Sequence, residues 1–427
     1  MRILYDVSSL GRGFGSELTR SGIFRVTREF VDEVRRRQDL SVHFAALPSL
    51  LDEVQLARYD RSHGAELERA IVTSWNPGEP LEACIELVDV LDAEPTARGA
   101  RLAKARVQLL NASARPLAVP EPYDIYHSLR PPLANASRVR SAVRVVTVHD
   151  AIPALFPELC DDSFVPAFEK VIASVDPQRD FVVCHSTSTR DDLTSVTSIP
   201  EERIFVVPPA ASRSTFFPQA DDDVVASTLA RHGIRDLGYV LSLGTLEPRK
   251  NLAELVRAFR ELVATAPFEE TALVLAGATG WKSDPIFEAV SAGRAAGARI
   301  VLPGHVPDAD LAALYRGAAL FVFPSMYEGF GLPVLEAMQC GTPVVTTNVS
   351  SLPEVAGTAA LTVEPTERAL LDAMRRVLGD PQLGLDLSRE GLERASRFSW
   401  EKTVEQTVAA YRQMLDSTVR RPPNAST

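Results

Sequence analysis

Short apolar runs rich in β-branched residues recur along the chain, and each is followed by small polar residues and then by a stretch with helical spacing. Near-continuous apolar runs of this kind are typical of parallel strands that helices cover on both faces. We therefore predict two doubly wound α/β units, one in each half of the chain. The predicted strands of the first unit are 3–7, 42–47, 125–129, 143–148, 181–184 and 204–207, and those of the second are 239–243, 272–276, 300–302, 319–323, 343–347 and 360–363.

The strand and helix rhythm is interrupted in two places. Between Pro208 and Asp236, prolines and the acidic run 221–223 break the pattern, so we expect the hinge between two domains there. From residue 50 to 120, Ala, Leu, Glu and Arg predominate with helical spacing, which predicts a helical insertion over one face of the first sheet. The predicted domains are therefore 1–218, which includes the insertion, and 219–402.

Composition and charge narrow the function classes. The chain has 427 residues, 45% of them hydrophobic and 24% charged, which fits a globular enzyme of about two or three domains. Its net charge of −11 repels nucleic acid, so no nucleic-acid partner is expected, and an anionic ligand must be held by local cations or helix N-termini. The cysteines show no CxxC spacing, which favours a reduced, cytoplasmic setting.

Peripheral membrane contact is a further expectation. No run of about 18 apolar residues is present to span a bilayer. The basic stretch 25–37 is a candidate for contact at the inner face of a membrane. Glu29, Asp32 and Glu33 dilute its charge, which favours a solvated face instead.

Ligands of open α/β sheets bind beyond the carboxyl ends of the strands, so the residues that follow the strands are the most informative. After the first strand, the glycines of 11–15 resemble a dinucleotide fingerprint with the third glycine one position early, and a mobile glycine loop is favoured over a phosphate contact. Next, Ser21 can cap a helix, while Gly22 and Arg25 can meet an anion. The alternative is an ordinary capped helix with a solvated arginine.

His149 and Asp150 follow the fourth predicted strand. A histidine there can donate to a substrate hydroxyl or carbonyl, and the adjacent acid can fix its tautomer or ring position. A purely structural hydrogen bond between the two is the alternative.

Two cations follow the first strand of the second half. Gly244 opens a loop that ends in Arg249 and Lys250, just before a predicted helix. A planar guanidinium beside a movable ammonium suits a diphosphate. Solvation is the ordinary role of a single surface cation, but a pair between strand and helix favours a ligand.

The most informative segment is 323–337, in which an apolar strand is followed by a glycine-containing loop and by Pro333 at the first helical turn. Glu328 lies in the loop and Glu336 about one turn inside the helix, so both carboxylates can face one cleft. The N–H groups around Gly331 point there too, with the positive end of the helix dipole behind them. Such a cradle accepts phosphate oxygens, while the acids accept sugar hydroxyls.

At these residues the chain resembles the retaining GT-B glycosyltransferases of family 4. The resemblance runs from residue 238 to 414 and includes the Glu328 and Glu336 pair, Arg249 with Lys250, and 303–306; the first half agrees mainly through Gly22 and His149. It implies two Rossmann-like domains facing a central cleft, the first binding the acceptor and the second a nucleotide sugar. A final helix at about 403–427 is expected to pack back on the first domain.

The resemblance also implies roles for individual residues. Glu336 is expected to bind the ribose, Glu328 the transferred sugar, and His149 to lie on the acceptor side, touching the donor sugar. The expected catalytic residues are His149, Arg249, Lys250 and Glu328, and the expected donor-binding residues are Gly22, Arg25, Gly244, His305, Val306, Gly329, Phe330, Gly331, Leu332 and Glu336.

Departure of a nucleoside diphosphate leaves growing charge on the β-phosphate, which the two cations and a helix N-terminus can stabilise. No DxD pair stands where a metal would be held, because 221–223 lies in the hinge, so no metal and no cofactor are expected, and transfer should retain the anomeric configuration. The segments 327–333 and 349–354 look most like mannosyl- or rhamnosyltransferases.

A mannose transfer from GDP-mannose to a glycan or lipid-linked saccharide is therefore the first choice. The alternatives are rhamnosyl or other hexosyl transfer from a dTDP- or UDP-sugar, a GT-B epimerase or phosphorylase, and a catalytically silent sugar-nucleotide-binding subunit. A NAD-dependent dehydrogenase has the least support, because the glycine spacing is wrong.

Overall fold

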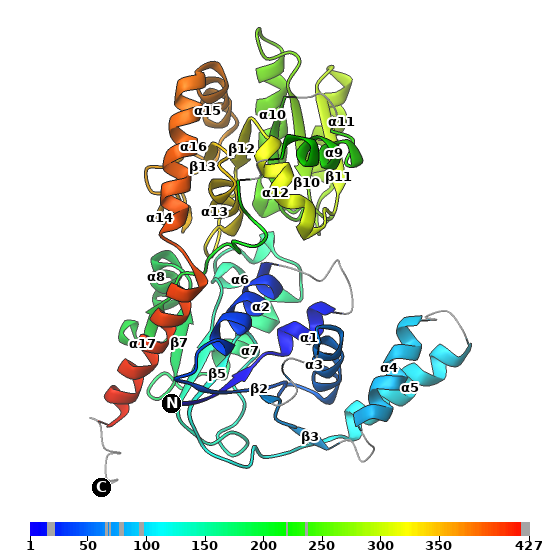
Figure 1. The fold of residues 1–427 in the computed structure, drawn as a ribbon, viewed down its shortest axis with the longest axis vertical. Helices are drawn as coiled ribbons and strands as arrows, with labels where there is room; N and C mark the ends of the chain where they lie inside the picture. The colour runs from blue at the N-terminus through cyan, green and yellow to red at the C-terminus, as the bar shows by residue number, and fades with distance from the viewer. Residues whose placement is uncertain are drawn as a thin grey trace.

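The computed structural model describes residues 1–14, 22–64, 67, 70–76, 81–93, 98–218, 221–234 and 238–419. It contains two six-stranded parallel sheets, one above the other in Figure 1. The first sheet has the order β2-β1-β5-β6-β7-β8. Its strands are β1 (Arg2–Asp6), β2 (Ser41–Ala45), β5 (Tyr123–Ser128), β6 (Ser141–Thr147), β7 (Phe181–Cys184) and β8 (Ile204–Val206).

The second sheet has the order β11-β10-β9-β12-β13-β14. Its strands are β9 (Tyr239–Leu243), β10 (Ala272–Ala276), β11 (Arg299–Gly304), β12 (Leu320–Phe323), β13 (Val344–Thr347) and β14 (Leu361–Val363). The strand order reverses between β9 and β12, where loops leave in opposite directions and open a crevice at the carboxyl edge. Each of the predicted strands is present, and the predicted doubly wound α/β class is confirmed.

Helices cover both faces of each sheet (Figure 1). Alternation along the strands explains this, because Ile3 and Tyr5 enter one apolar cluster and Leu4 enters another. In the first half the helices are α1 (Ser8–Phe14), α2 (Gly22–Arg35), α3 (Leu50–Ser62), α4 (Leu81–Ala93), α5 (Arg98–Ser113), α6 (Ile152–Leu155), α7 (Phe164–Ala173) and α8 (Thr187–Val196), with the short turns η3 (Pro157–Leu159) and η4 (Glu201–Arg203).

In the second half the helices are α9 (Asp222–Arg231), η5 (Pro248–Lys250), α10 (Leu252–Val263), α11 (Asp284–Ala295), α12 (Asp308–Gly317), α13 (Leu332–Gln339), α14 (Leu352–Ala356), α15 (Glu367–Gly379), α16 (Pro381–Ser396) and α17 (Trp400–Val419). None of the helices in the described part of the chain has the length and apolar character needed to cross a bilayer.

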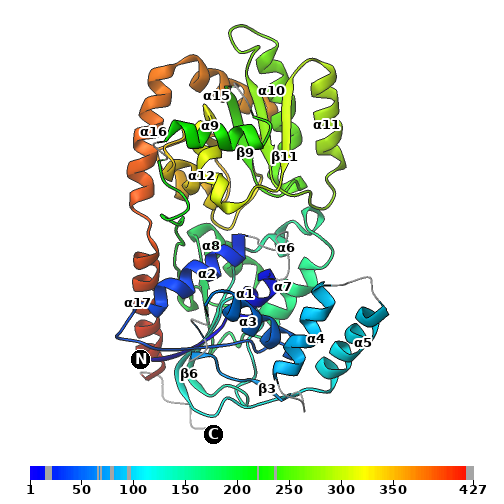
Figure 2. The same cartoon turned by 45° about the vertical axis from the view of Figure 1, so that its right-hand side comes forward.

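The chain passes between the two domains twice. Ala210 packs in a core cluster of the first domain and Ala211 in one of the second, so the first crossing lies between them. Ala395 belongs to the second domain and Trp400 to the first, which places the return crossing between α16 and α17. Figures 1 and 2 show these two helices in line along one side of both domains. α17 packs against α2 and β6, so the C-terminal helix belongs to the first domain.

One expectation about the first domain is wrong, and a second holds only in part. The glycine-rich stretch after β1 is not a loop, because α1 continues to Phe14; Gly15 and Ser21 lie outside the described residues. A Cβ on Gly11 would lie 2.6 Å from the Leu56 backbone nitrogen, so this glycine serves close packing of α1 on α3.

The insertion covers the sheet only through α3. α3 directs Leu56 and Tyr59 toward the core of the first domain, and Leu50 and Val54 toward α4 and α5. The hairpin of α4 and α5 therefore has its own apolar cluster on the far side of α3 and projects from the domain (Figures 1 and 2). Two short antiparallel strands, β3 (Trp75–Asn76) and β4 (Arg115–Pro116), join it to the domain.

Candidate active site

Residues from several strand ends meet at the carboxyl edge of the second sheet. The loop after β9 carries Gly244 and the turn η5, which contains Arg249 and Lys250. The loop after β12 carries Ser325 and Glu328. β9 and β12 are the neighbouring strands at which the strand order reverses. The fold therefore brings the two predicted cations and the predicted loop carboxylate to the position where open α/β sheets bind ligands.

Three donors converge on one carboxylate oxygen. Lys250 Nζ and Arg249 Nη1 both lie 2.7 Å from Glu328 Oε1. Ser325 Oγ donates to the same oxygen at 2.6 Å. Lys250 lies 78 residues before Glu328 in the chain, and the contact between them is buried. Charge-assisted hydrogen bonds of this length fix Glu328 in a single orientation.

The charges in this cluster compensate one another. Burial raises the pKa of the Glu328 carboxyl, but Arg249 and Lys250 outweigh burial and bring this pKa to about 2. Glu247 accepts from Arg249 Nη2 at 2.5 Å and supplies a second carboxylate. Burial, together with the charge of Arg249, lowers the pKa of Lys250. Glu328 is therefore ionised at neutral pH, and the two cations face two acids.

Lys250 is better placed than Arg249 to take a further ligand. Arg249 already donates through Nη1 to the Tyr327 carbonyl and Glu328, and through Nη2 to Glu247. Lys250 has three N–H groups, and its contact with Glu328 uses one of them. Its ammonium also lies 4.7 Å from the Phe323 ring centroid. Gly244 adjoins it, since a Cβ there would lie 3.3 Å from Lys250 Cε.

The N-terminus of α13 completes this edge of the site. Gly331 is its N-cap with φ of 106°, a left-handed conformation that favours glycine, and a Cβ there would lie 2.7 Å from Leu352 Cδ2. Pro333 lies in the first turn, where its missing N–H costs no helical bond. The first N–H groups of a helix have no partner within it and carry partial positive charge. Gly331 and Leu332, at the start of α13, therefore offer backbone N–H groups at this edge of the site.

Glu336, on α13, is bound from both domains. Tyr315 donates to its Oε2 at 3.0 Å, and Arg25 Nη2 from α2 of the first domain lies 2.9 Å from its Oε1. Burial raises the pKa of Glu336, while Arg25 opposes this rise. The alternative of a solvated Arg25 is wrong, because Arg25 pairs with Glu336, which is 2% exposed. Gly22 begins the same helix and is exposed.

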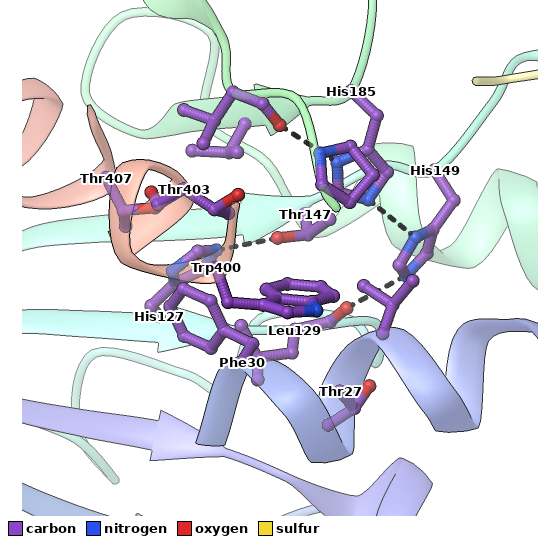
Figure 3. Close-up of a pocket in the computed structure, with 14 residues that line it drawn as sticks. Thr27, Phe30, His127, Leu129, Thr147, His149, His185, Trp400, Thr403 and Thr407 are labelled. Atoms are coloured by element: carbon purple, nitrogen blue, oxygen red, sulfur yellow. Dashed lines mark hydrogen bonds between the residues drawn. The ribbon is translucent and has the colours of Figure 1, made fainter. Parts of the chain in front are cut away.

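His149 follows β6 and faces the second domain through its backbone. A Cβ on Gly329 would overlap the carbonyl oxygen of His149, so the two domains touch there. In its ring, Nε2 lies 3.1 Å from the Leu129 carbonyl and Nδ1 lies 2.9 Å from His185 Nε2 (Figure 3). Burial and the nearby His185 lower the pKa of His149 well below its usual value, so the ring is neutral. Because a carbonyl only accepts, Nε2 carries the proton.

The expectation that Asp150 fixes the ring of His149 is wrong. Asp150 Oδ1 accepts instead from the backbone N–H of Ile152, the first residue of α6, at 3.0 Å. His185 takes the positioning role, because it follows β7, whose end lies beside the end of β6. The rule that led to His149 would have found His185 too, since both stand at carboxyl ends of neighbouring strands.

His149 is one of the residues that line a small cavity in the first domain (Figure 3). The cavity measures about 30 Å³, which is space on the order of one or two water molecules rather than a sugar. Polar groups from three strand ends and from α17 line it, and Trp400 Nε1 among them is buried without a hydrogen-bond partner among the described residues. They are His127, Thr147, His149, His185, Trp400, Thr403 and Thr407.

Three further site residues were not assigned roles from the sequence: Glu247, Tyr315 and Ser325. Each of them orients a residue to which the sequence did assign a role. Glu247 contacts Arg249, Tyr315 contacts Glu336, and Ser325 contacts Glu328. His305 and Val306 follow β11 at the same edge of the sheet, with His305 exposed and Val306 buried. Phe330 and Leu332 flank Gly331, and Phe330 is buried in the core of the second domain.

Known proteins share both this sequence pattern and this fold. The family model of glycosyl transferases group 1 matches residues 229–394. The O-antigen chain mannosyltransferase B of Escherichia coli is 36% identical over 269 residues, which cover 63% of this chain and 70% of that protein. The chain belongs to the group 1 glycosyl transferases.

Other relatives of this glycosyltransferase are more distant. The serotype-specific mannosyltransferase WbdA of Escherichia coli is 29% identical over 281 residues, and the match spans 34% of its length. Among solved structures, the sucrose-phosphate synthase of Thermosynechococcus elongatus has a TM-score of 0.63 at 19% identity, covering 98% of this chain and 100% of that one. Anabaena HepE in complex with UDP and glucose has a TM-score of 0.65 at 15% identity, covering 97% and 100%. The fold is GT-B.

Proposed function

We propose that this glycosyltransferase moves mannose from GDP-mannose to a hydroxyl of a glycan or lipid-linked saccharide, without a metal and with retention of configuration. Support for the sugar comes from the relatives, since the O-antigen chain mannosyltransferase B and WbdA are both mannosyltransferases. Guanine is the preferred base because the sequences of 327–333 and 349–354 resemble those of mannosyl- or rhamnosyltransferases.

The observation that carries the proposal is the cluster of Lys250, Arg249 and Glu328 beside the N-terminus of α13. A departing nucleoside diphosphate gathers negative charge on its β-phosphate, and donors fixed in advance stabilise that charge without reorganising. Among the described residues Lys250 Nζ donates only to Glu328, which leaves it two N–H groups, and α13 adds backbone N–H groups and its dipole. Glu336 accepts the ribose hydroxyls, and Glu328 accepts a hydroxyl of the transferred sugar.

The state of Glu328 supports retention by attack on the face that the diphosphate leaves. A covalent nucleophile needs a carboxylate that can approach the anomeric carbon and share its charge. Glu328 instead has its Oε1 held by two cations and a hydroxyl, and its pKa of about 2 marks a weakly basic oxygen. Its role is to bind and orient the sugar, while the leaving β-phosphate oxygen takes the proton of the acceptor hydroxyl.

The donor is tested first by thermal stabilisation. A nucleotide sugar that binds only the native state raises its melting temperature by mass action. GDP-mannose should shift the melting temperature more than UDP-, dTDP- or ADP-sugars do. A larger shift with a uridine or thymidine nucleotide would contradict the guanine assignment.

Transfer is then tested with the preferred donor and a saccharide acceptor, with and without EDTA. We expect a product with the donor's anomeric configuration by NMR, and turnover that EDTA leaves unchanged. Release of free sugar without an acceptor product would favour an epimerase or phosphorylase, and binding without any turnover would favour a silent subunit.

A further inference from the structure

Arg25 and Glu336 form an ion pair between the two domains. Arg25 lies in the first turn of α2, and its Nη2 is 2.9 Å from Glu336 Oε1 on α13. Its other terminal nitrogen is directed at the same domain, with Nη1 3.8 Å from Asp308 Oδ1 at the start of α12. The guanidinium also lies 5.6 Å from the Phe216 ring centroid, in the segment where the chain has already crossed to the second domain. All three contacts therefore cross to the donor-binding side.

This pair covers the carboxylate that the proposed function assigns to the ribose. Glu336 is 2% exposed, with Tyr315 on one carboxylate oxygen and Arg25 on the other. Tyr315 is a buried residue of the second domain's own core, so it does not move away with the first domain. Arg25 is the one of these two groups that belongs to the opposite domain, so its departure can open Glu336 to a ligand.

One terminal nitrogen of Arg25 makes no hydrogen bond to the described residues. Its Nη1 is buried and has no hydrogen-bond partner among the described residues, since 3.8 Å to Asp308 is too long for one. An unmade bond on a buried donor costs free energy. Arg25 therefore leaves one of its terminal nitrogens without a hydrogen bond in this arrangement. This lowers the free-energy cost of exchanging its contact with Glu336 for a contact between Glu336 and a ligand.

We propose that Arg25 is a latch on the ribose site. In the ligand-free enzyme it holds Glu336 and closes the donor site across the two domains, and the ribose hydroxyls of the donor displace it. This inference rests on the proposed function, because it takes Glu336 as the ribose-binding residue. It assigns to Arg25 a role opposite to simple donor binding: removing its side chain should strengthen nucleoside binding rather than weaken it.

The magnitude follows from population arithmetic. A ligand that binds only the unlatched form shows its intrinsic affinity reduced by the fraction of molecules that are unlatched. Couplings of this kind usually amount to about 5- to 150-fold. Replacing Arg25 with methionine keeps the aliphatic stem and removes the charge, so the affinity should rise by at least about fivefold.

The experiment measures guanosine and uridine affinity by titration for the wild type, Arg25→Met and Arg28→Met. Nucleosides carry no phosphate, so a loss of phosphate contacts cannot mask the effect. Arg28 is the matched control, because it lies on the same helix and pairs with Glu29 of that helix. We expect tighter nucleoside binding for Arg25→Met and none of this gain for Arg28→Met. Unchanged or weaker binding for Arg25→Met would overturn the latch.

A ligand-free measurement separates the latch from the proposed function. The melting temperatures of Arg25→Met, Glu336→Gln and the double variant form a thermodynamic cycle. If the two side chains form the latch, each single variant already loses their interaction. The double variant should then lower the melting temperature by less than the two single decreases added together. Additive effects would overturn the latch even if nucleotides bind. Non-additive effects in a protein that binds no nucleoside or nucleotide sugar would keep the pair and contradict the proposed function instead.

Discussion

Gly329 of the second domain lies directly against the backbone carbonyl of His149 in the first domain. A Cβ at this glycine would overlap that oxygen, and it would come within 2.9 Å of Asp150 Cβ as well. The Gly329 carbonyl accepts in turn from Ser186 Oγ at 2.8 Å and from Thr189 Oγ1 at 3.2 Å, both of the first domain. One glycine backbone therefore sets how closely the two domains approach beside the predicted catalytic residues.

The first prediction concerns Gly329→Ala. The added methyl has rigid backbone in its way, so the domains must separate locally to accept it. We expect turnover to fall by at least about 100-fold, since misplacement by about 1 Å costs that much in pre-organised sites. Initial rates with donor and acceptor check this.

Gly384→Ala on α16 is its control. A Cβ at Gly384 has no atom within 4 Å, so the alanine should leave turnover unchanged and favour the helix slightly. Wild-type turnover in Gly329→Ala would show that the close approach of the domains is not required.

The second prediction concerns Lys250→Met. The change removes a cation that, within the described part of the chain, donates only to Glu328, while Arg249 still pairs with that carboxylate. Loss of one donor to developing charge costs about 100- to 1,000-fold in kcat, and we expect that loss here. Lys402→Met is the control, because Lys402 donates to the Arg397 carbonyl on an exposed part of the chain. Circular dichroism checks the fold, and a variant with intact kcat would contradict the role of Lys250.

Local pattern was enough to predict the strands and the position of the site. Buried parallel strands have a strong signal, and the rule that ligands bind at carboxyl ends pointed to Arg249, Lys250 and Glu328. The side-chain contacts between the two domains have no comparable pattern in the sequence. That Arg25 meets Glu336 depends on how one domain sits on the other, and no periodicity within either segment encodes it.

Helical propensity also predicted a helical insertion, but not how its helices pack on the rest of the first domain. The α3 sequence has apolar residues on two sides, and only the packing shows that one side faces the sheet and the other faces α4 and α5. Likewise, adjacency in sequence favoured Asp150 as the partner of His149, whereas adjacency of strand ends in space made it His185.

The third prediction concerns Glu354, whose carboxylate caps a helix of the opposite domain. Its Oε2 and Oε1 accept from the backbone N–H groups of Thr187 and Ser188 at the start of α8, at 2.8 and 2.7 Å. Glu354→Ala removes a charged cap and its interaction with the helix dipole, which together stabilise by about 1 kcal/mol. Because the cap joins the domains, we expect a raised KM for the donor along with a lower melting temperature.

Thr366→Ala provides the comparison for Glu354. Thr366 caps α15 within the second domain by accepting from the Ala369 N–H. Its loss should lower the melting temperature to a similar degree and leave KM unchanged. Equal KM values in the two variants would mean that the Glu354 cap contributes stability alone.

The last prediction concerns pH and the buried His127. Its Nδ1 lies 2.5 Å from the Tyr411 hydroxyl of α17, and its Nε2 lies 2.8 Å from Thr147 Oγ1. Burial, aided by the charge of His185, lowers the pKa of His127 to about 3 in the folded protein. In the unfolded chain the value is about 6.5. Below pH 6.5 the unfolded state therefore binds a proton that the folded state excludes.

The sign follows from proton linkage. His127 contributes full stability above pH 6.5, and this contribution is lost as the pH falls from 6.5 toward 3, by about 1.4 kcal/mol per pH unit. Replacing His127 with glutamine removes the titrating group, so the free energy of unfolding should fall less steeply with decreasing pH than in the wild type. Urea unfolding at about pH 7.5, 6.5 and 5.5 gives the free energy of unfolding at each pH, and thus both slopes. His63→Gln, at an exposed position, is the control for replacing a histidine with glutamine. Parallel slopes for the wild type and His127→Gln would show that His127 takes up its proton in the folded protein, and that the contact of α17 with the first sheet does not depend on a neutral ring.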